Sequence, residues 1–282
     1  MPSDDPIFAL LQPERISSIV DVGANPIDGD PPYKPMLAKR LCRVLGFEPQ
    51  PNALDQLNRQ KSSHETYLPY ILGNGGEARL HVCKTPGMTS LLAPNPKVMR
   101  HFHGFSQWGK VVETQTVSTR RLDDIEEIEE MDFLKIDIQG GELSVFQNGR
   151  QKLSRAVAVQ TEVSFLPLYK NQPLFAEVDI ELRKLGFVPH AFATINKRMI
   201  APLSVGNNPY AAINQLLEAD VVYVRDFTRL GEIDPERLKH LALIAHHCYG
   251  SFDLTMACID RLAKEREIDH DAGDRYVAML GR

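Results

Sequence analysis

The sequence predicts an α/β fold built on a seven-stranded, doubly wound sheet. Seven apolar runs of strand length alternate with segments of helical periodicity along the chain. The first run ends in the small-residue turn Val20-Asp-Val-Gly-Ala-Asn25, and the second ends in an acid within Val44-Leu-Gly-Phe-Glu-Pro49. This layout is typical of a nucleotide-binding βαβ unit, whose ligand lies at the carboxyl ends of the strands near the switch point.

The individual elements follow from the same periodicity. We expect strands at 18–22, 43–47, 67–72, 133–138, 156–163, 187–192 and 221–225. Helical patterns occupy 36–43, 53–60, 142–153 and 175–185, and Gly186 is expected to end the last of them as a C-cap. Two further apolar runs, at 80–83 and 111–117, predict a β-rich insertion between the third and fourth strands.

The pattern changes after residue 230. Segments 235–245 and 254–264 are amphipathic and are separated by Tyr249-Gly-Ser-Phe-Asp253, which predicts an αα-hairpin with an N-cap near Ser251 or Asp253. We therefore divide the chain into a domain of residues 1–230 and a helical appendage of residues 231–282. Because two apolar faces must be covered, we expect the appendage to dock on the domain or to form a homodimer, with a protein partner as the alternative.

Composition limits the class of protein. With 282 residues, 43% of them hydrophobic, the chain can bury a substantial core, and its net charge of −5 gives no reason to expect nucleic acid as a partner. The N-terminus lacks a basic stretch leading into an apolar segment, and no run reaches 18 apolar residues, so we expect a cytoplasmic protein without a membrane span. The four cysteines form no C-x-x-C pair, which favours free thiols.

The turn after the first strand separates the possible ligands. A dinucleotide needs a Gly-rich loop at a helix N-terminus, whereas Gly23 is followed here by Ala-Asn-Pro-Ile-Asp-Gly-Asp30. A proline without an N–H and two acids disfavour a pyrophosphate, which makes NAD or FAD the weaker alternative. S-adenosyl-L-methionine (SAM) fits better, because it carries a ribose and a positive sulfur but no phosphate. We predict that Glu48 accepts hydrogen bonds from the ribose hydroxyls.

Six motifs give the chain a family resemblance. They are Val20-Asp-Val-Gly-Ala-Asn25, Gly46-Phe-Glu-Pro49, Gly87-Met-Thr-Ser-Leu91, Thr119-Arg-Arg-Leu-Asp123, Leu134-Lys-Ile-Asp-Ile-Gln-Gly-Gly-Glu142 and Gln160-Thr-Glu162. In this order they resemble FkbM-type SAM-dependent methyltransferases, over residues 16 to 227. The resemblance implies a Rossmann-like class I methyltransferase fold and O-methylation of a hydroxyl on a small molecule or glycan, with S-adenosyl-L-homocysteine (SAH) as product. A sugar is the favoured acceptor.

Two departures from the family pattern bear on the site. Where the family usually has a glycine shortly after the Gly-Ala-Asn turn, this chain has Pro26-Ile27, so we expect the methionine end of the cofactor to be held differently. The commonly acidic position two residues after Asp137 is Gln139, which cannot act as a base. The cofactor contacts that we predict are Asp21, Gly23, Ala24, Asn25, Glu48, Pro49, Ser90, Asp137 and Glu142.

Methyl transfer from a sulfonium is an in-line displacement, and a base or a metal helps an alcohol to react. Lys135 and Asp137 share one strand face, so Asp137 is expected either to pair with Lys135 structurally or to face the acceptor, the methionine amine or a divalent ion. Glu162 ends the fifth strand at the same cleft, and we assign both acids as catalytic candidates. Glu142 begins the next helix, where a dipole interaction and a cofactor role are both open.

The segment His101-Phe-His-Gly-Phe-Ser-Gln-Trp108 holds an H-x-H pair beside the only tryptophan. Two histidines could bind metal or supply a base, but no third ligand is nearby, so we favour a lid over the acceptor and take His103 as the third catalytic candidate. Surface loop residues are the alternative. We assign no metal site and leave a divalent metal open as a cofactor. The acidic stretch 123–132 is expected to be a solvated helix or linker.

Two other functions stay open. The first is a catalytically silent SAM-fold adaptor that recruits a partner through its C-terminal helices, which the altered Pro26-Ile27 turn permits. The second is an NAD-dependent sugar oxidoreductase, against which the missing phosphate loop argues.

Overall fold

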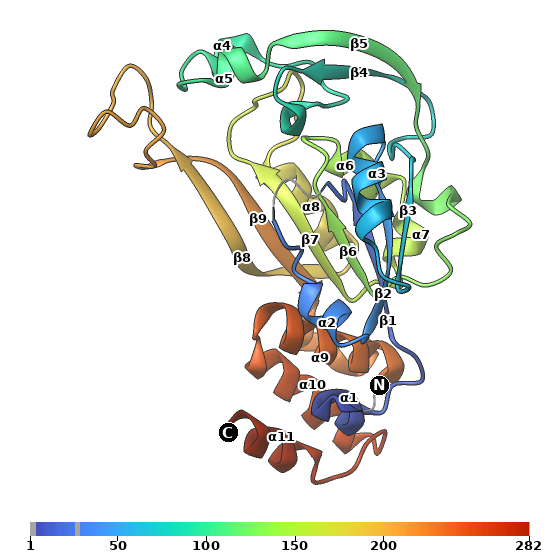
Figure 1. The fold of residues 1–282 in the computed structure, drawn as a ribbon. Helices are drawn as coiled ribbons and strands as arrows, with labels where there is room; N and C mark the ends of the chain where they lie inside the picture. The colour runs from blue at the N-terminus through green and yellow to red at the C-terminus, as the bar shows by residue number, and fades with distance from the viewer. Residues whose placement is uncertain (1–3, 26–28, 282) are drawn as a thin grey trace.

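The computed structural model describes residues 4–25 and 29–281 and confirms the predicted seven-stranded sheet (Figure 1). Its order is β3-β2-β1-β6-β7-β9-β8. Strand β1 pairs in parallel with both β2 and β6, so the sheet order reverses at β1 and the switch point lies there. The strands are β1 (Ser17–Val22), β2 (Cys42–Phe47), β3 (Glu65–Leu68), β6 (Phe133–Ile136), β7 (Ala158–Ser164), β8 (Phe187–Arg198) and β9 (Gln215–Arg225).

The last two strands are much longer than predicted. β9 runs antiparallel to both β7 and β8, and β8 and β9 remain paired as far as Arg198 and Gln215. They extend past the body of the sheet as a two-stranded ribbon (Figure 1). Because this ribbon is mostly exposed, its residues follow no continuous apolar pattern, and periodicity could not extend the strands into it.

Alternate residues of each central strand face opposite hydrophobic layers. In β1, Ile19 belongs to one buried cluster while Val20 and Val22 belong to the other, and Phe133 and Leu134 of β6 divide in the same way. Helices on both faces cover the sheet, as a doubly wound fold requires.

One face is covered by α6 (Glu142–Gln147), α7 (Arg150–Leu153) and α8 (Phe175–Lys184). The single helix predicted at 142–153 is therefore broken, at Asn148 and Gly149. Gly149 packs tightly, since a Cβ there would lie 2.5 Å from the Leu122 side chain. Helix α8 ends as predicted, because Gly186 follows it at a φ of +84°.

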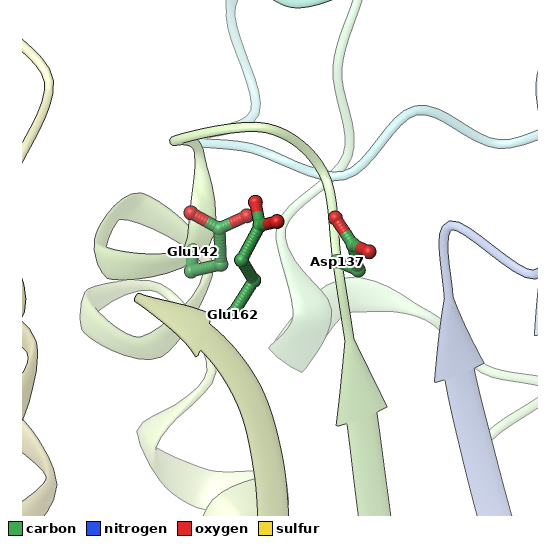
Figure 2. A group of neighbouring side chains, drawn as sticks. All are labelled: Asp137, Glu142 and Glu162. Atoms are coloured by element: carbon green, nitrogen blue, oxygen red, sulfur yellow. The ribbon is translucent and has the colours of Figure 1, made fainter. Parts of the chain in front are cut away.

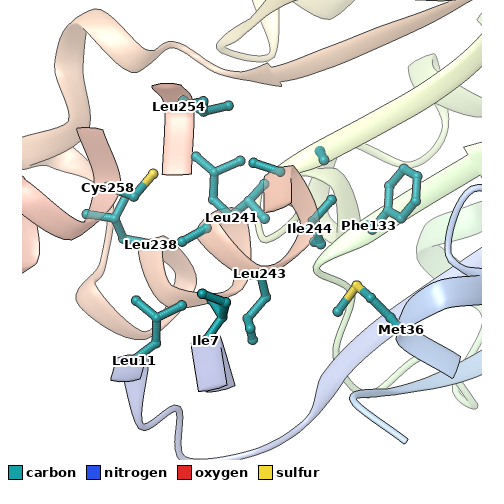
Figure 3. Packing of buried hydrophobic residues seen from close by; sticks show 14 of the residues in the cluster. Ile7, Leu11, Met36, Phe133, Leu238, Leu241, Leu243, Ile244, Leu254 and Cys258 are labelled. Atoms are coloured by element: carbon teal, nitrogen blue, oxygen red, sulfur yellow. The ribbon is translucent and has the colours of Figure 1, made fainter. Parts of the chain in front are cut away.

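The other face is covered by helices from both ends of the chain. They are α1 (Pro6–Leu11), α2 (Lys34–Ala38), α9 (Pro235–Tyr249), α10 (Phe252–Lys264) and α11 (Ala272–Leu280). Figure 3 shows α1, α9 and α10 bringing Ile7, Leu241 and Leu254 into one apolar cluster, which also contains Phe133 of the sheet. The predicted hairpin is present, with Ser251 as the N-cap of α10, whereas α1 and α11 were not predicted.

The predicted insertion is a separate antiparallel pair of strands, β4 (Glu77–Cys83) and β5 (Val111–Ser118). Three short helices lie between these two strands in the chain. The remaining elements are α3 (Pro51–Gln60), η3 (Pro86–Met88), α4 (Pro96–Met99), α5 (Phe105–Trp108), η4 (Leu122–Asp124) and η5 (Phe227–Glu232).

The acidic stretch 123–132 was predicted wrongly to be solvated throughout. Ile125, Ile128 and Met131 are buried in the core, and the Asp132 side chain is 1% exposed. Among the described residues, no helix combines the length and the apolar character needed to cross a membrane.

Candidate functional site

A cavity of about 330 Å³ opens at the carboxyl ends of β1, β2 and β6, next to the switch point. The turn after β1, the end of β2 and the β4–β5 insertion all contribute to its wall. Its lining includes Gly23, Asn25, Phe47, Glu48, Pro49, Tyr70, Leu72, Ser90, Asp137 and Gln139. Six of the nine predicted cofactor contacts therefore line one cavity, and Asp21, Ala24 and Glu142 do not.

The turn after β1 depends on Gly23. This residue has a φ of +79°, and a Cβ there would lie 2.0 Å from the carbonyl oxygen of Asp137, so only glycine fits. The N–H groups of Gly23 and Ala24 both donate to Phe47 O, at 3.0 and 3.2 Å. These bonds fix the end of β1 against the end of β2. Pro26, Ile27 and Asp28 lie outside the described residues, so the altered turn itself stays a prediction.

The Asp21 side chain is held by contacts within the protein. Its Oδ2 accepts a 2.6 Å hydrogen bond from Tyr33, and its Oδ1 lies 3.3 Å from Lys135 Nζ. The β1–β6 register places Asp21 directly opposite Lys135. This corrects the expectation that Lys135 pairs with Asp137, because a cross-strand neighbour is closer than a residue two positions along the same strand.

Glu48 stands at the end of β2, as predicted, and is 2% exposed. Its Oε1 accepts a 2.7 Å hydrogen bond from the Gln50 N–H, and burial raises its pKa. In the described part of the chain it forms no ion pair, and the charge of Lys135 only partly offsets the effect of burial on its pKa.

The charge of the cavity lining distinguishes between cofactor classes. None of its described lining residues is Lys, Arg or His, while Glu48 and Asp137 are acidic. A dinucleotide would bring a diphosphate next to these carboxylates, which is unfavourable. A cofactor with hydroxyl donors, an ammonium and a sulfonium fits the same residues, and the apolar Phe47, Tyr70 and Leu72 offer a surface for an adenine.

Three carboxylates from two strand ends and a helix start meet beside this cavity. Oxygen atoms of Asp137, Glu142 and Glu162 all lie within 4.8 Å of one another. In Figure 2 the carboxylate of Glu162 lies between those of the other two. The spacing would allow a divalent cation to be shared, and it also brings together two of the three catalytic candidates.

Glu142 supports the loop that follows β6. Its Oε1 accepts hydrogen bonds from the N–H groups of Ile138 and Gly140, at 2.9 and 3.2 Å. Burial raises the pKa of Glu142 to about 7. Since it does not line the cavity, these contacts give Glu142 the role of holding the loop that carries Asp137 and Gln139.

Asp137 and Glu162 are connected by an amide. Gln139 Nε2 donates to Asp137 Oδ1 at 2.9 Å and to Glu162 Oε2 at 3.0 Å. Burial, followed by the charge of Asp137, raises the pKa of Glu162 well above its usual range. Two acids on β9 join this group: burial raises the pKa of Glu218 to about 7 and also raises that of Asp220.

Sequence reasoning missed Gln139, Glu218 and Asp220 as members of the site. Gln139 was noted only as a lost acid. The signal for Glu218 and Asp220 was their alternation with Leu217, Ala219 and Val221, which predicts one strand face, but the predicted strand began at 221.

Ser90 lines the cavity, and its hydroxyl donates to Gln139 O at 2.7 Å and accepts from the Leu92 N–H at 2.9 Å. Thr89 Oγ1 accepts from the Cys83 N–H. His103 lies elsewhere: its Nε2 is 2.9 Å from Leu203 O, and it does not line the cavity. The neighbouring Trp108 packs on Phe105 and Tyr210. The catalytic role of His103 stays a prediction.

Comparison with known proteins places the chain in a family. Residues 21–189 match the sequence model of the methyltransferase FkbM domain. The 2-O-methyltransferase NoeI of Sinorhizobium fredii (strain NBRC 101917 / NGR234) is 26% identical over 184 residues, which cover 62% of this chain and 74% of NoeI.

Solved methyltransferase structures show weaker likeness. Magnesium protoporphyrin IX methyltransferase (ChlM) from Synechocystis PCC 6803, with bound SAM, has a TM-score of 0.39 at 9% identity, covering 75% of this chain and 71% of ChlM. Precorrin-6y C5,15-methyltransferase from Geobacter metallireducens GS-15 has a TM-score of 0.39 at 12% identity, covering 78% and 86%. Because the family match spans more than half of the chain and contains the turn, Glu48 and the carboxylate group, the chain belongs to the FkbM methyltransferase family.

Proposed function

We propose that this chain is a cytoplasmic SAM-dependent O-methyltransferase that acts on a hydroxyl of a small molecule or glycan, with a sugar as the favoured acceptor. The observation that carries the proposal is the cavity at the switch point, with two carboxylates and no basic residue in its described lining. Family membership supports methyl transfer. The name of NoeI, a 2-O-methyltransferase, supports oxygen as the methylated atom.

The cavity lining suggests how SAM would be held. Glu48 would accept hydrogen bonds from the ribose hydroxyls, and Asp137 would face the ammonium and sulfonium end. Gly23 and Asn25 would lie along the methionine, because both line the cavity at the turn after β1. Pro49 and Ser90 complete the predicted contacts. SAM supplies an activated methyl group, and the remaining chemistry belongs to the residues of this chain.

The acceptor side of the reaction needs a group that removes a proton. The acceptor oxygen forms a bond to the methyl carbon as the carbon–sulfur bond breaks, and the hydroxyl proton must move to a base. Glu162 and Asp137 are the carboxylates beside the cavity. Because removal from water raises the pKa of Glu162, this carboxylate is more basic than a solvated one, which suits the task.

Calorimetric titration with SAH, SAM and NAD tests the cofactor first. We expect both adenosyl ligands to bind and NAD not to bind. At about 100 times its Kd, a ligand stabilises the folded state by about 2.7 kcal/mol, so a thermal shift gives an independent check. Binding of NAD without SAH would overturn the proposal in favour of the oxidoreductase.

The acceptor class is tested with SAM carrying a labelled methyl group. Free sugars, nucleotide-linked sugars and glycans are offered in turn, and the methylated position is read by NMR. SAH binding with no transfer to any hydroxyl compound would favour the adaptor alternative.

The C-terminal helices dock on the domain, as one of the two expectations had it. We propose that their exposed face forms a homodimer, with a protein partner as the alternative. Deleting residues 231–282 cannot test it, because Leu238, Leu241 and Leu254 share a core with Phe133 of the sheet. Replacing the exposed Val277 and Leu280 by serine, followed by light scattering, leaves that core intact. A dimer that persists in the double variant would exclude this face.

A further inference from the structure

Gln139 lies between the two catalytic candidates and uses both hydrogens of its amide on them. Its Nε2 is 2.9 Å from Asp137 Oδ1 and 3.0 Å from Glu162 Oε2. Its Oε1 accepts from the hydroxyl of Tyr169, at 3.1 Å. The side-chain amide is therefore hydrogen-bonded at both of its polar atoms.

The neighbouring groups determine the orientation of the Gln139 side-chain amide. If it were reversed, Oε1 would face oxygens of Asp137 and Glu162, and the NH₂ group would face the Tyr169 hydroxyl. In the observed orientation the N–H groups face the carboxylates and the oxygen faces a hydroxyl donor. Tyr169 is 1% exposed and its hydroxyl also lies 3.1 Å from Met88 O, so this donor is held in place.

The backbone of Gln139 is fixed as well. The residue has a φ of +59°, a left-handed conformation that non-glycine residues seldom adopt. Its carbonyl oxygen accepts a 2.7 Å hydrogen bond from Ser90, and Glu142 holds the N–H groups on either side of it. This conformation directs the side chain back over the end of β6 toward Glu162.

Among the described residues, no ion pair with a cation holds these two carboxylates together. Within residues 4–25 and 29–281, neither Asp137 nor Glu162 forms an ion pair with Lys or Arg, and Lys135 has its ion pair with Asp21. Two carboxylates this close repel each other, and the repulsion is offset by hydrogen bonds that favour the charged forms. The Gln139 amide supplies one such bond to each.

We propose that Gln139 is a positioning residue that holds Asp137 and Glu162 together by occupying, with its NH₂ group, the place between them that a cation would otherwise take. The proposal rests on the proposed function, in which Glu162 accepts the hydroxyl proton. With Oε2 of Glu162 hydrogen-bonded to the amide, Oε1 is the oxygen that takes the proton as the oxygen–methyl bond forms and the carbon–sulfur bond breaks.

Two substitutions separate the donor from the shape of the side chain. Gln139→Glu replaces the NH₂ group by an oxygen and places a third carboxylate beside the pair, and Gln139→Met keeps the length without a polar atom. Gln147→Glu makes the same change of charge at an exposed position on α6 and is the matched control. Thermal unfolding verifies that each variant is folded.

The first measurement needs no acceptor: Mn²⁺ alone is titrated and followed by electron paramagnetic resonance. We expect Gln139→Glu to bind Mn²⁺ at least tenfold more tightly than the wild type, with no gain in Gln139→Met or Gln147→Glu. A wild type that binds Mn²⁺ as tightly as Gln139→Glu would overturn the proposal, because the amide would then not occupy the cation's place.

The second measurement uses the acceptor found by the methyl-transfer screen. Both Gln139 variants should lose at least tenfold in kcat while the Kd for SAH stays within about threefold of the wild type, which is the sign of a positioning role. Unchanged kcat in both variants would overturn the proposal. If the wild type binds no SAH, the proposed function fails, while the Mn²⁺ result still decides whether Gln139 occupies this place.

Discussion

An aspartate stands at each end of the four-residue strand β6, and the two have opposite surroundings. Asp132, directly before the strand, receives two hydrogen bonds from Arg15, at 2.6 and 2.8 Å, and one from the Ser18 N–H at 2.7 Å. Asp137, directly after it, has an amide and other carboxylates as neighbours. The first is paired and buried; the second is partly buried and faces a cavity.

The difference separates a structural acid from a reactive one. A buried carboxylate with a guanidinium partner stabilises the fold only while both partners are present. Buried carboxylates without an ion-pair partner cost stability, because burial and mutual repulsion act together. Proteins keep such unfavourable groups mainly where chemistry needs them, and we therefore propose that the carboxyl end of β6 is the functional end and the amino end is the structural one.

The strongest test of the contrast removes the reactive end. Glu162→Gln and Asp137→Asn should each lower the rate of methyl transfer about 10²- to 10⁴-fold, because the base or its neighbour is lost. Stability should be unchanged or higher, since a repelling charge is removed. Rates with the acceptor and urea unfolding of the same preparations measure both effects.

Glu113→Gln, an exposed change on β5, is the control and should alter neither quantity. Wild-type turnover in Glu162→Gln would remove Glu162 from the catalytic candidates. A large loss of stability in the same variant would show that the two ends of β6 do not differ as argued.

The next effect belongs to the structural end. Asp132→Asn should lower the free energy of unfolding by about 2–4 kcal/mol, because Arg15 loses its two-bonded partner and keeps only Glu130, 3.8 Å away, while the hydrogen bonds to residue 132 weaken. SAH binding per folded molecule should not change. Urea unfolding gives the stability, and calorimetry gives the affinity.

Asp55→Asn on the exposed face of α3 is the matched control, with an expected change within about 0.5 kcal/mol. Weaker SAH binding by folded Asp132→Asn would show that the two ends of the strand are coupled.

A smaller effect comes from the pH dependence of stability. Glu142 has a folded-state pKa of about 7 against an ordinary value of 4.5. As the pH rises from 4.5 to 7, the unfolded chain releases this proton before the folded protein does, so the free energy of unfolding falls. Glu142→Gln removes the titration but keeps an oxygen for the Ile138 and Gly140 N–H groups. It should gain stability over the wild type across this window, by about 1–3 kcal/mol.

Urea unfolding at pH 4.5, 6 and 8 measures the gain. Parallel profiles for the two proteins would mean that Glu142 is not held in its neutral form. In that case the group of carboxylates would cost the folded protein less stability than the contrast with Asp132 predicts.

The sequence was sufficient for the parts of the site that depend on local pattern. Gly23 and Glu48 were predicted because a strand that ends in a small-residue turn, followed by one that ends in an acid, is a pattern of neighbours in the chain. The count of seven strands and the doubly wound character of the sheet followed from the same alternation. Each of these features is fixed within one βαβ unit.

The sequence was insufficient wherever contacts cross between distant segments. Lys135 was assigned to Asp137, two residues away, but sheet register gives it Asp21 from a strand more than 100 residues earlier in the chain. Asp132 lies in an acid-rich stretch and looked solvated, since the Arg15 that pairs with it is equally remote. Gln139 was interpreted only as the loss of an acid, because the hydrogen-bond partners of its side chain include Glu162 and Tyr169, which belong to later segments of the chain.

The smallest predicted effect concerns Glu48, the remaining buried carboxylate without an ion pair in the described chain. Glu48→Gln keeps Oε1 for the Gln50 N–H but turns an NH₂ group toward the cavity, so one of the two acceptors offered to the ribose hydroxyls becomes a donor. A hydroxyl can still accept from that group, which limits the loss. We expect the Kd for SAH to rise about tenfold, or about 1.4 kcal/mol, with kcat at saturating SAM unchanged.

Glu77→Gln on exposed β4 is the control. If Glu48→Gln lowered kcat but left the Kd for SAH unchanged, Glu48 would belong with Glu162 on the reacting side, and the division of the carboxyl-end acids into cofactor-binding and proton-accepting groups would be wrong.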